Sequence, residues 1–255
     1  MQTAEKKDRT RLWRVVSVLA ALALWQTVAL LLNERLILVS PVAVFLRLLT
    51  IWREAGFLSA VWFSFSRITL GFFLALVTGS VLAIMAGRFR ILGILLHPYM
   101  VTVKTVPVVS FIVLAYVWLS SGAISVFICF LIVLPTVYTG LLTGLRSVDK
   151  KMVEMAEVFR IPFGRRLRAI YLPHLSPYIL SAASLSAGLA WKSGVAAEII
   201  SIPGGSIGGM IHYADLWLLT EDMYAWTVIL VLASVAFEKL FVLLIKKLMG
   251  RVTRI

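Results

Sequence analysis

The stretch EMAEVFRIPFGRRLRAIYLP, residues 154–173, is the longest amphipathic and charge-rich segment in a chain that is otherwise mostly apolar. Its first half, together with Met152 two residues before it, places four apolar side chains on one helical face: Met152, Met155, Ala156 and Phe159. Pro162 interrupts this helix, because the residue before a proline is pushed out of the helical region. We predict two short helices joined by a turn, the second of which ends at Pro173.

The second half of this stretch combines an apolar ridge with a basic face. The ridge consists of Phe163, Leu167, Ile170 and Tyr171, and the basic residues are Arg165, Arg166 and Arg168. An amphipathic helix of this kind either docks in a groove of a soluble subunit or lies on anionic lipid, and residue chemistry alone favours neither. The docking interpretation uses Phe159, Ile161 and Phe163 as apolar anchors and Glu154 in the polar rim.

The composition indicates a membrane protein. The chain has 255 residues, 61% of them hydrophobic and 15% charged, with a mean hydropathy of +0.97, whereas a soluble domain is nearer half apolar and a quarter charged. Backbone polar groups at membrane depth must be satisfied within each segment, so the expected fold class is all-α. The net charge of +13 is typical of basic residues held on the cytoplasmic side of a membrane protein, so we expect no nucleic-acid partner. Cys129 is the one cysteine and excludes an intrachain disulfide.

Six apolar runs predict six transmembrane helices. They cover Leu12–Leu32, Val61–Ala86, Leu92–Leu119, Ile124–Leu145, Tyr178–Ile200 and Met223–Leu244. The first run exceeds the apolar core of a signal peptide, so we expect a retained anchor. Pro98 and Pro107 interrupt the third run, and Val42–Trp52 is predicted to be a helix on the membrane surface. The second run carries small residues every four positions, which predicts close helix contact on that face: Gly71, Ala75, Gly79 and Ala83.

The distribution of Lys and Arg predicts the orientation. With the N-terminus inside, 18 of the 25 basic residues fall on the inner side and only Arg35, Arg47 and Arg53 on the outer side. Both termini and the 154–173 stretch are therefore expected in the cytoplasm. The predicted division is a cytoplasmic tail at 1–11, a single transmembrane domain at 12–248 with a loop at 146–176, and a cytoplasmic tail at 249–255.

The 154–173 stretch resembles the cytoplasmic loop of permease subunits of bacterial ATP-binding-cassette (ABC) importers, which has the form E-A-A-x3-G-x9-I-x-L-P. The matching residues are Glu154, Ala156, Ile170, Leu172 and Pro173. Met155 replaces the middle alanine, and Arg160 stands where the family usually has glycine. Because Gly164 follows closely, we expect the turn to be rebuilt around residues 162–164.

Other segments are similar to permeases of the sulfonate, nitrate and taurine importer group. They are Val39–Pro41, Ser64–Phe72, Lys104–Pro107, Leu189–Trp191, Ala196–Glu198 and Gly204–Gly208. The resemblance implies a type I importer permease in a bacterial inner membrane, paired with a second copy of itself, surrounded by lipid, contacting two cytoplasmic ATPases and fed by an extracytoplasmic solute-binding protein. It implies no cofactor in this chain, since ATP and Mg would be bound by the ATPase. The implied coupling residues are Glu154, Ala156, Phe159, Arg160, Ile161, Phe163, Gly164 and Pro173.

No catalytic or metal site is visible in the sequence. There is no glycine-rich phosphate loop ending in Lys-Ser or Lys-Thr, and the histidines stand far apart: His97, His174 and His212. We therefore expect no enzyme activity in this chain, with ATP hydrolysis in a separate subunit. A secondary carrier or a channel is the alternative transport class, but it needs no docking loop, and secondary carriers often show two related halves that this sequence lacks.

Ionisable residues at membrane depth are candidates for a solute path, because such groups are costly in lipid. The candidates are Lys104, Lys192 and Glu198, together with Trp191. Cationic groups facing a cavity suit an alkanesulfonate, taurine or nitrate, and the alternatives are an interhelical ion pair or another solute such as a pyrimidine precursor of thiamine. Two further expectations are that Arg67 extends to the interface and that Glu238 and Lys239 link their span to another.

Overall fold

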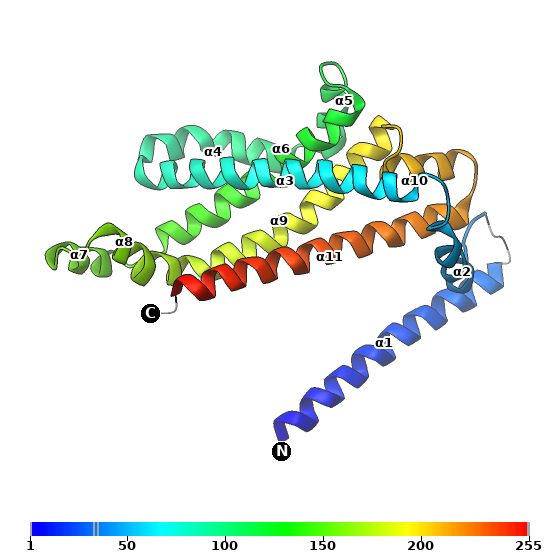
Figure 1. Ribbon diagram of the computed structural model, residues 1–255, viewed down its shortest axis with the longest axis horizontal. Helices are drawn as coiled ribbons and strands as arrows, with labels where there is room; N and C mark the ends of the chain where they lie inside the picture. The colour runs from blue at the N-terminus through cyan, green and yellow to red at the C-terminus, as the bar shows by residue number, and fades with distance from the viewer. Residues whose placement is uncertain (1, 33, 35, 254–255) are drawn as a thin grey trace. The chain divides into compact units, whose positions relative to one another are not determined.

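Helices form the regular structure of the computed structural model, which describes residues 2–32, 34 and 36–253 (Figure 1). In chain order they are α1 (Gln2–Leu32), α2 (Pro41–Ile51), α3 (Phe57–Arg88), α4 (Arg90–Thr105), α5 (Val108–Ala115), α6 (Ser121–Arg146), α7 (Lys150–Val158), α8 (Phe163–Arg166), the π-helix η1 (Leu167–Tyr171), α9 (Leu172–Ser201), α10 (Ile207–Leu216) and α11 (Thr220–Thr253). Met1, Asn33, Arg35, Arg254 and Ile255, which include the ends of both predicted tails, lie outside the described residues. Because α1 begins at Gln2, the predicted N-terminal tail shares one helix with the first predicted span.

Among the described residues, four helices are long and apolar enough to cross a membrane. They are the Val15–Leu32 part of α1, α3, α6 and α11. Helices α4 and α5 meet at a bend of 99° and pass the same test as one broken span. The break falls at Pro107, as predicted, whereas Pro98 lies inside α4 without ending it.

The remaining predicted span, Tyr178–Ile200, lies in α9, which is 30 residues long but less apolar than the others. Its buried residues are mostly Ala, Ser and Gly. These small side chains suit a helix that is covered by neighbouring helices rather than by lipid. The lower hydropathy of α9 therefore has a packing reason.

Contacts divide the chain into two compact units. Unit 1 comprises Met1–Leu58 and Met210–Ile229, and unit 2 comprises Ser59–Gly209 and Leu230–Ile255. The single transmembrane domain at 12–248 remains a prediction.

In unit 2, the small residues of α3 pack against α6. A Cβ atom added at Gly71 would lie 2.5 Å from the carbonyl oxygen of Val126, and one at Gly79 would lie 3.1 Å from that of Leu134. Separations below 3.4 Å are tighter than ordinary carbon contacts. The backbones of α3 and α6 therefore approach each other closely, and the predicted contact face of the second span is confirmed.

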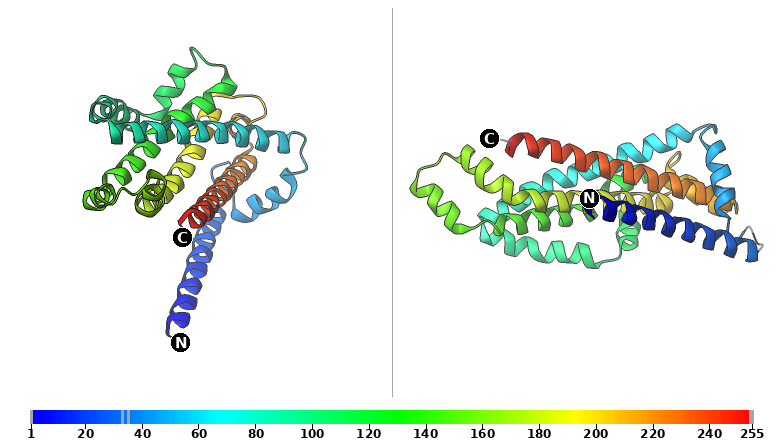
Figure 2. Two further views of the ribbon diagram at one scale, coloured as in Figure 1. Left: turned by 60° about the vertical axis from the view of Figure 1, so that its left-hand side comes forward. Right: turned by 90° about the horizontal axis from the view of Figure 1, so that it is seen from below.

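Helices α6 and α9 also approach closely, and they run side by side in both further views (Figure 2). Gly140 and Gly144 of α6 are four residues apart, so they lie on one face. A Cβ at Gly140 would be 2.7 Å from the Cβ of Ala182, and one at Gly144 would be 3.0 Å from the Cβ of Tyr178. This glycine pair was not singled out in the sequence, although its spacing is typical of close helix pairs in membranes.

Aromatic rings fill the core of unit 2 between α3, α9 and α11. Phe72 packs edge-on against Phe237 and Phe241, with ring centroids 5.3 and 4.8 Å apart. Trp191 of α9 is 1% exposed and contacts Phe65 and Phe237 at 6.2 Å. Edge-to-face and tilted pairs at these distances are favourable, so the cluster joins the three helices.

In unit 1, the start of α2 explains the Val39-Ser40-Pro41 segment. The Ser40 hydroxyl accepts a hydrogen bond from the backbone N–H of Ala43 at 3.3 Å, and Pro41 occupies the first helical turn, where no N–H is needed. The helix Pro41–Ile51 confirms the predicted helix at Val42–Trp52. Its position on a membrane surface remains a prediction.

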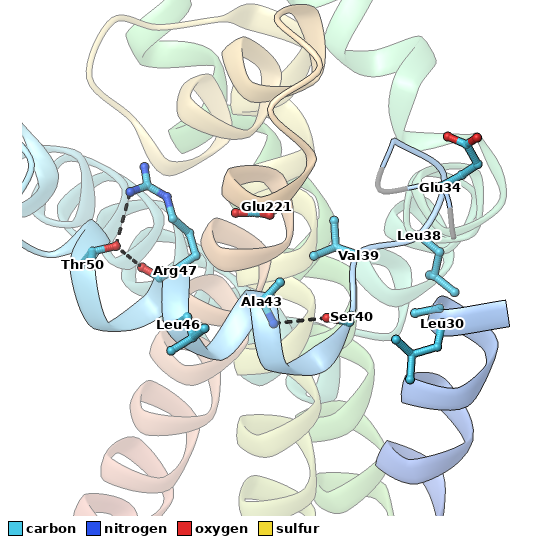
Figure 3. Close-up of a pocket in the computed structure, with 11 residues that line it drawn as sticks. Leu30, Glu34, Leu38, Val39, Ser40, Ala43, Leu46, Arg47, Thr50 and Glu221 are labelled. Carbon is cyan, nitrogen blue, oxygen red and sulfur yellow. Dashed lines mark hydrogen bonds between the residues drawn. The ribbon is translucent and has the colours of Figure 1, made fainter. Parts of the chain in front are cut away.

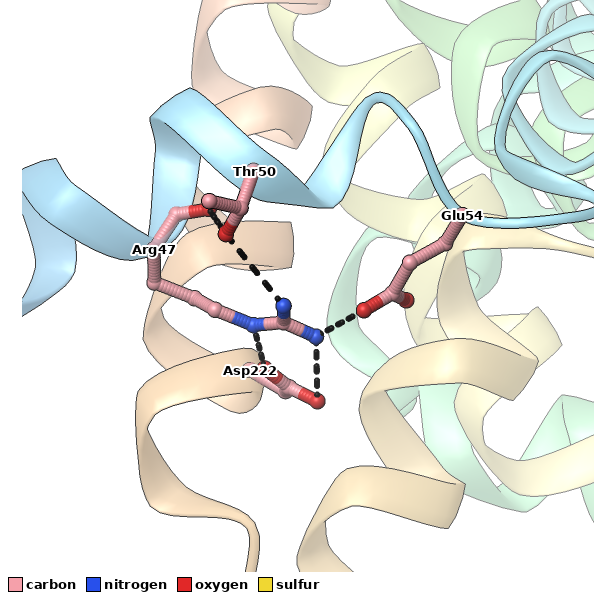
Figure 4. Close-up of polar contacts among 4 residues, drawn as sticks. All are labelled: Arg47, Thr50, Glu54 and Asp222. Atoms are coloured by element: carbon pink, nitrogen blue, oxygen red, sulfur yellow. Dashed lines mark hydrogen bonds and ion pairs between the residues drawn. The ribbon is translucent and has the colours of Figure 1, made fainter.

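Arg47 ties α2 to the first turn of α11 within unit 1 (Figure 4). Its guanidinium donates to both carboxylate oxygens of Asp222, with Nη2 3.0 Å from Oδ2, and also contacts Glu54. The hydrogen bond to Asp222 raises the pKa of Arg47 above its usual value. Arg47 also lines a groove of about 570 Å³ with Glu34 and Glu221 (Figure 3).

Candidate functional site

The amphipathic loop begins as the two-helix structure that the sequence predicts. Asp149 caps α7, since its carboxylate accepts a hydrogen bond from the backbone N–H of Lys151 at 2.9 Å. At the other end, the N–H of Arg160 donates to the carbonyl of Glu157 and the N–H of Ile161 donates to that of Ala156, both at 2.9 Å. These two bonds form a Schellman motif, which satisfies the last carbonyls of the helix.

Arg160 holds the left-handed position of this motif, with φ at 50°. Glycine is the usual residue there, because a Cβ atom crowds the backbone in that conformation. The family's glycine and this arginine therefore serve the same turn. Gly164 lies inside α8 and has no positive φ, so the prediction that the turn is rebuilt around residues 162–164 is wrong.

Arg166, which follows the turn, bonds to two residues that lie in or before it. Its Nε donates to the carbonyl of Ile161 at 2.6 Å, and its Nη1 lies 3.2 Å from the Glu157 carboxylate. The sequence grouped Arg166 with the other arginines of the basic face. Its nine-residue separation from Glu157, across a turn, is why no helical spacing rule pointed to this pair.

Pro173 does not end the second helix. The chain stays helical from α8 through η1 into α9, and Pro173 sits in the first turn of α9. The reason is the π-helical turn before it, in which the N–H of Leu172 donates to the carbonyl of Leu167, five residues back. Such a turn adjusts the backbone locally, so that the proline ring fits without a break.

The loop exposes an apolar patch, which we call the docking patch: Met155, Val158, Phe159 and Phe163. Phe159 is 73% exposed and Phe163 is similar, whereas Ile161 is half-buried. Ala156 is fully buried, so its place in the family motif is a packing position beneath the patch. Glu154 is exposed and lines a groove of about 380 Å³ beside Arg146.

Glu198 belongs to a buried hydrogen-bonded cluster, which we call the Ser64–Glu198 clamp. Glu198 is fully buried, and its Oε2 accepts hydrogen bonds from the Ser64 hydroxyl at 2.6 Å and from the N–H of Gly208 at 3.1 Å. The Ser64 hydroxyl in turn accepts from the N–H of Ile207 at 2.9 Å. Helices α3 and α9 thus supply the partners for the first N–H groups of α10.

The glycine-rich segment before α10 has a steric reason at two positions. Gly205 has φ at 69°, a conformation that disfavours other residues. A Cβ at Gly208 would lie 2.4 Å from the Cβ of Glu198 and 2.7 Å from the backbone nitrogen of Ile199. Only glycine therefore lets α10 start this close to α9.

The other predicted path residues lie in different surroundings. Lys104 is exposed, and its Nζ lies 3.0 Å from the hydroxyl of Thr139. Lys192 is also exposed, whereas Trp191 lies in the aromatic core. The path role of Lys104, Trp191, Lys192 and Glu198 remains a prediction.

Glu238 and Arg67, two other ionisable residues of the predicted spans, each make a hydrogen bond to a different helix. Glu238 accepts a hydrogen bond from the Ser184 hydroxyl of α9, which confirms the expected link between spans for Glu238. The link expected for Lys239 stays a prediction. Arg67 donates to the carbonyl of Gly122 at 2.7 Å and stacks on Phe63. Its guanidinium therefore bonds to the start of α6.

Several membrane-length apolar helices, a broken span and an exposed amphipathic loop indicate a multi-pass membrane protein. Residues 75–254 match the family described as binding-protein-dependent transport system inner membrane component, and the chain belongs to that family. Its fold is that of a type I ABC importer permease.

Individual relatives agree with this assignment. The chain is 30% identical over 223 residues to the taurine transport system permease protein of Escherichia coli, covering 85% of this chain and 80% of the relative. It is 27% identical over 230 residues to the putative aliphatic sulfonates transport permease protein of Bacillus subtilis, covering 89% and 83%. It is 25% identical over 143 residues to the nitrate import permease protein of Synechococcus elongatus, covering 56% and 51%. The chain therefore falls in the sulfonate, nitrate and taurine group of inner-membrane permeases.

Proposed function

We propose that this permease moves a small organic anion into the cell by alternating access, driven by separate ATPase subunits that grip the docking patch. The observation that carries the proposal is an exposed apolar patch on a turn that is held rigidly. Its phenylalanines stand out from the surface, while the Schellman motif and Arg166 fix the backbone beneath them. Apolar anchors on a fixed helix are what a groove in a soluble partner recognises.

The remaining parts of the proposed assembly follow from the same role. A second copy of the chain completes the pore, a solute-binding protein delivers the anion from outside, and the ATPases bind ATP and Mg. The docking patch and both termini face the cytoplasm, in agreement with the excess of Lys and Arg predicted on that side.

The solute class rests on the relatives and on the cationic residues. The named solutes of three relatives are taurine, aliphatic sulfonates and nitrate, and each of these carries an anionic group. A pyrimidine precursor of thiamine is the competing solute. Uptake by the assembled complex of radiolabelled taurine, ethanesulfonate, nitrate and the pyrimidine precursor of thiamine separates these possibilities.

The docking role is tested with Phe159→Asp in the complex of permease and ATPase. A charge placed in an apolar contact removes a binding anchor, so we expect roughly thirtyfold weaker co-purification of the ATPase and loss of coupled uptake. Trp217→Asp is the matched control, because Trp217 is an aromatic residue of similar exposure, at 71%, but lies in the turn between α10 and α11, outside the predicted spans. Normal coupling in the Phe159→Asp complex would refute the proposal.

Two other results would also contradict it. Solute uptake by the permease without any ATPase would indicate a secondary carrier or a channel. Cleavage of the docking patch by a protease added outside intact cells would reverse the proposed orientation.

A further inference from the structure

Two hollows in unit 2 flank the side chain of Lys104. The first, of about 420 Å³, lies among α4, α6 and α9, and the second, of about 260 Å³, lies between α4 and α6. Both are lined by Lys104, Thr139 and Thr143. One lysine and one face of α6 therefore serve both hollows.

Hydroxyl groups gather on this face of α6. Thr136, Thr139 and Thr143 are spaced by three and four residues, so they form one stripe along the helix. The close contact at Gly140 brings α9 alongside, and Tyr178 and Ser181 of α9 line the same hollow as the threonines. The hydroxyl of Tyr138, a residue that is 3% exposed, has no hydrogen-bond partner within the described residues, and Tyr138 lines the second hollow.

The charges in the two hollows have one sign. Lys104 lies where the hollows meet, and Arg146 and His97 line the second one. Among the described residues that line either hollow there is no Asp or Glu. A lysine at membrane depth is costly unless it meets water or an anion. Within the described residues, the Lys104 ammonium donates a hydrogen bond to the neutral hydroxyl of Thr139.

We propose that the two hollows form an anion path in which Lys104 passes a small oxyanion along the threonine stripe toward Arg146. Two of the three N–H donors of Lys104 remain for the solute. The hydroxyls of Thr136 and Thr143 can donate to its oxygens, whereas the Thr139 hydroxyl donates to the Pro135 carbonyl at 2.7 Å and holds the ammonium in place. Ala182 and Leu185 supply an apolar wall in the first hollow, which suits the short alkyl chain of a sulfonate or carboxylate. The inference rests on the proposed import of anions and assigns that solute to particular residues.

The local charge is tested without transport by thiol labelling. Cys129 is fully buried, so a Thr143→Cys variant carries one accessible thiol. We compare its rates of modification by an anionic and by a cationic methanethiosulfonate reagent, each relative to the same reagent's rate with free 2-mercaptoethanol. The positive field predicts about a tenfold preference for the anionic reagent.

Added substitutions then assign this preference to Lys104. Because Arg146 also lines the second hollow, we expect Lys104→Gln to reduce the preference at least threefold without abolishing it. We expect Lys104→Arg to retain it and Lys239→Gln to leave it unchanged, because Lys239 is exposed and lines neither hollow. Retention of the charge in Lys104→Arg separates an electrostatic role from a structural one. A preference that Lys104→Gln does not reduce, or a Thr143→Cys thiol that favours neither reagent, would overturn the proposal.

Transport then links the hollows to the solute. In the complex with its ATPase and its solute-binding protein, millimolar ethanesulfonate or taurine is expected to slow modification of the Thr143→Cys thiol at least threefold. Active uptake without such protection would overturn the path while leaving the importer function intact. An unsubstituted complex that imports none of ethanesulfonate, taurine and nitrate would instead refute the anionic solute of the proposed function.

Discussion

Gly208→Ala is the substitution whose effect follows most directly from the structure. The new methyl group would lie 2.4 Å from the Cβ of Glu198, 2.7 Å from the nitrogen of Ile199 and 2.9 Å from the carbonyl carbon of Glu198. Two of these three atoms belong to the backbone of α9, so no side-chain rotation relieves the overlap. The start of α10 must therefore move about 1 Å away from α9 to restore ordinary contacts.

The expected magnitude combines strain with lost hydrogen bonds. Overpacking of one methyl group in a close contact costs about 1–3 kcal/mol. A shift of about 1 Å also stretches the 3.1 Å bond from Gly208 to Glu198 beyond hydrogen-bond range. An unmade buried bond costs about 1 kcal/mol or more, so the total is about 2–4 kcal/mol.

The assay is thermal unfolding of the purified permease in detergent, followed by loss of the monodisperse peak in size-exclusion chromatography. For a chain of this size the predicted loss lowers the apparent Tm by roughly 5–15 °C. Gly204→Ala is the matched control, since a Cβ there meets no atom within 4 Å and should leave the Tm unchanged. Equal Tm values for the two variants would refute the reasoning about the Ser64–Glu198 clamp.

Three further predictions concern other contacts. Arg160→Gly should relieve the strain of the left-handed backbone by about 1 kcal/mol and slow hydrogen exchange in the turn roughly fivefold. Gly164→Ala should stabilise α8 slightly, because Gly164 lies inside that helix. If Gly164→Ala instead destabilised the protein, the turn would have to lie at residues 162–164. Gly140→Ala should lower the apparent Tm by separating α6 from α9, whereas Gly188→Ala, with no atom within 4 Å, should not. Arg47→Ala should cost about 1–2 kcal/mol, because the half-buried Asp222 carboxylate loses its partner, and an unchanged Tm would contradict this.

Local spacing in the sequence was enough to predict several contacts. The four-residue repeat of small residues in the second span predicted a close helix contact on that face, because a helical period fixes which residues share a face. It did not identify α6 as the partner. The break at Pro107 and the Ser40-Pro41 start of α2 follow from backbone rules that act within a few residues. These features depend on no distant part of the chain.

The features that the sequence did not predict depend on distant partners. Glu198 was a candidate path residue, and nothing in its own helix indicated that Ser64 and the start of α10 would enclose it. The turn was predicted near Gly164 because glycine favours the left-handed conformation. The backbone hydrogen bonds from Arg160 and Ile161 to the end of α7 place it at Arg160 instead. Pro173 was predicted to end its helix, but the π-helical turn at Leu167–Tyr171 lets the helix continue past the proline ring.

The uninterrupted helical run from Phe163 to Ser201 has a mechanical consequence. At one end it carries part of the docking patch, and near the other end it carries Glu198, which grips the start of α10. At 1.5 Å per residue, a straight α-helix of this length spans about 58 Å, so a tilt of about 5° around one end displaces the other end by roughly 5 Å. If the run moves as one body, a small tilt around the end that carries Phe163 is expected to displace the Glu198 end by more than an ion's radius.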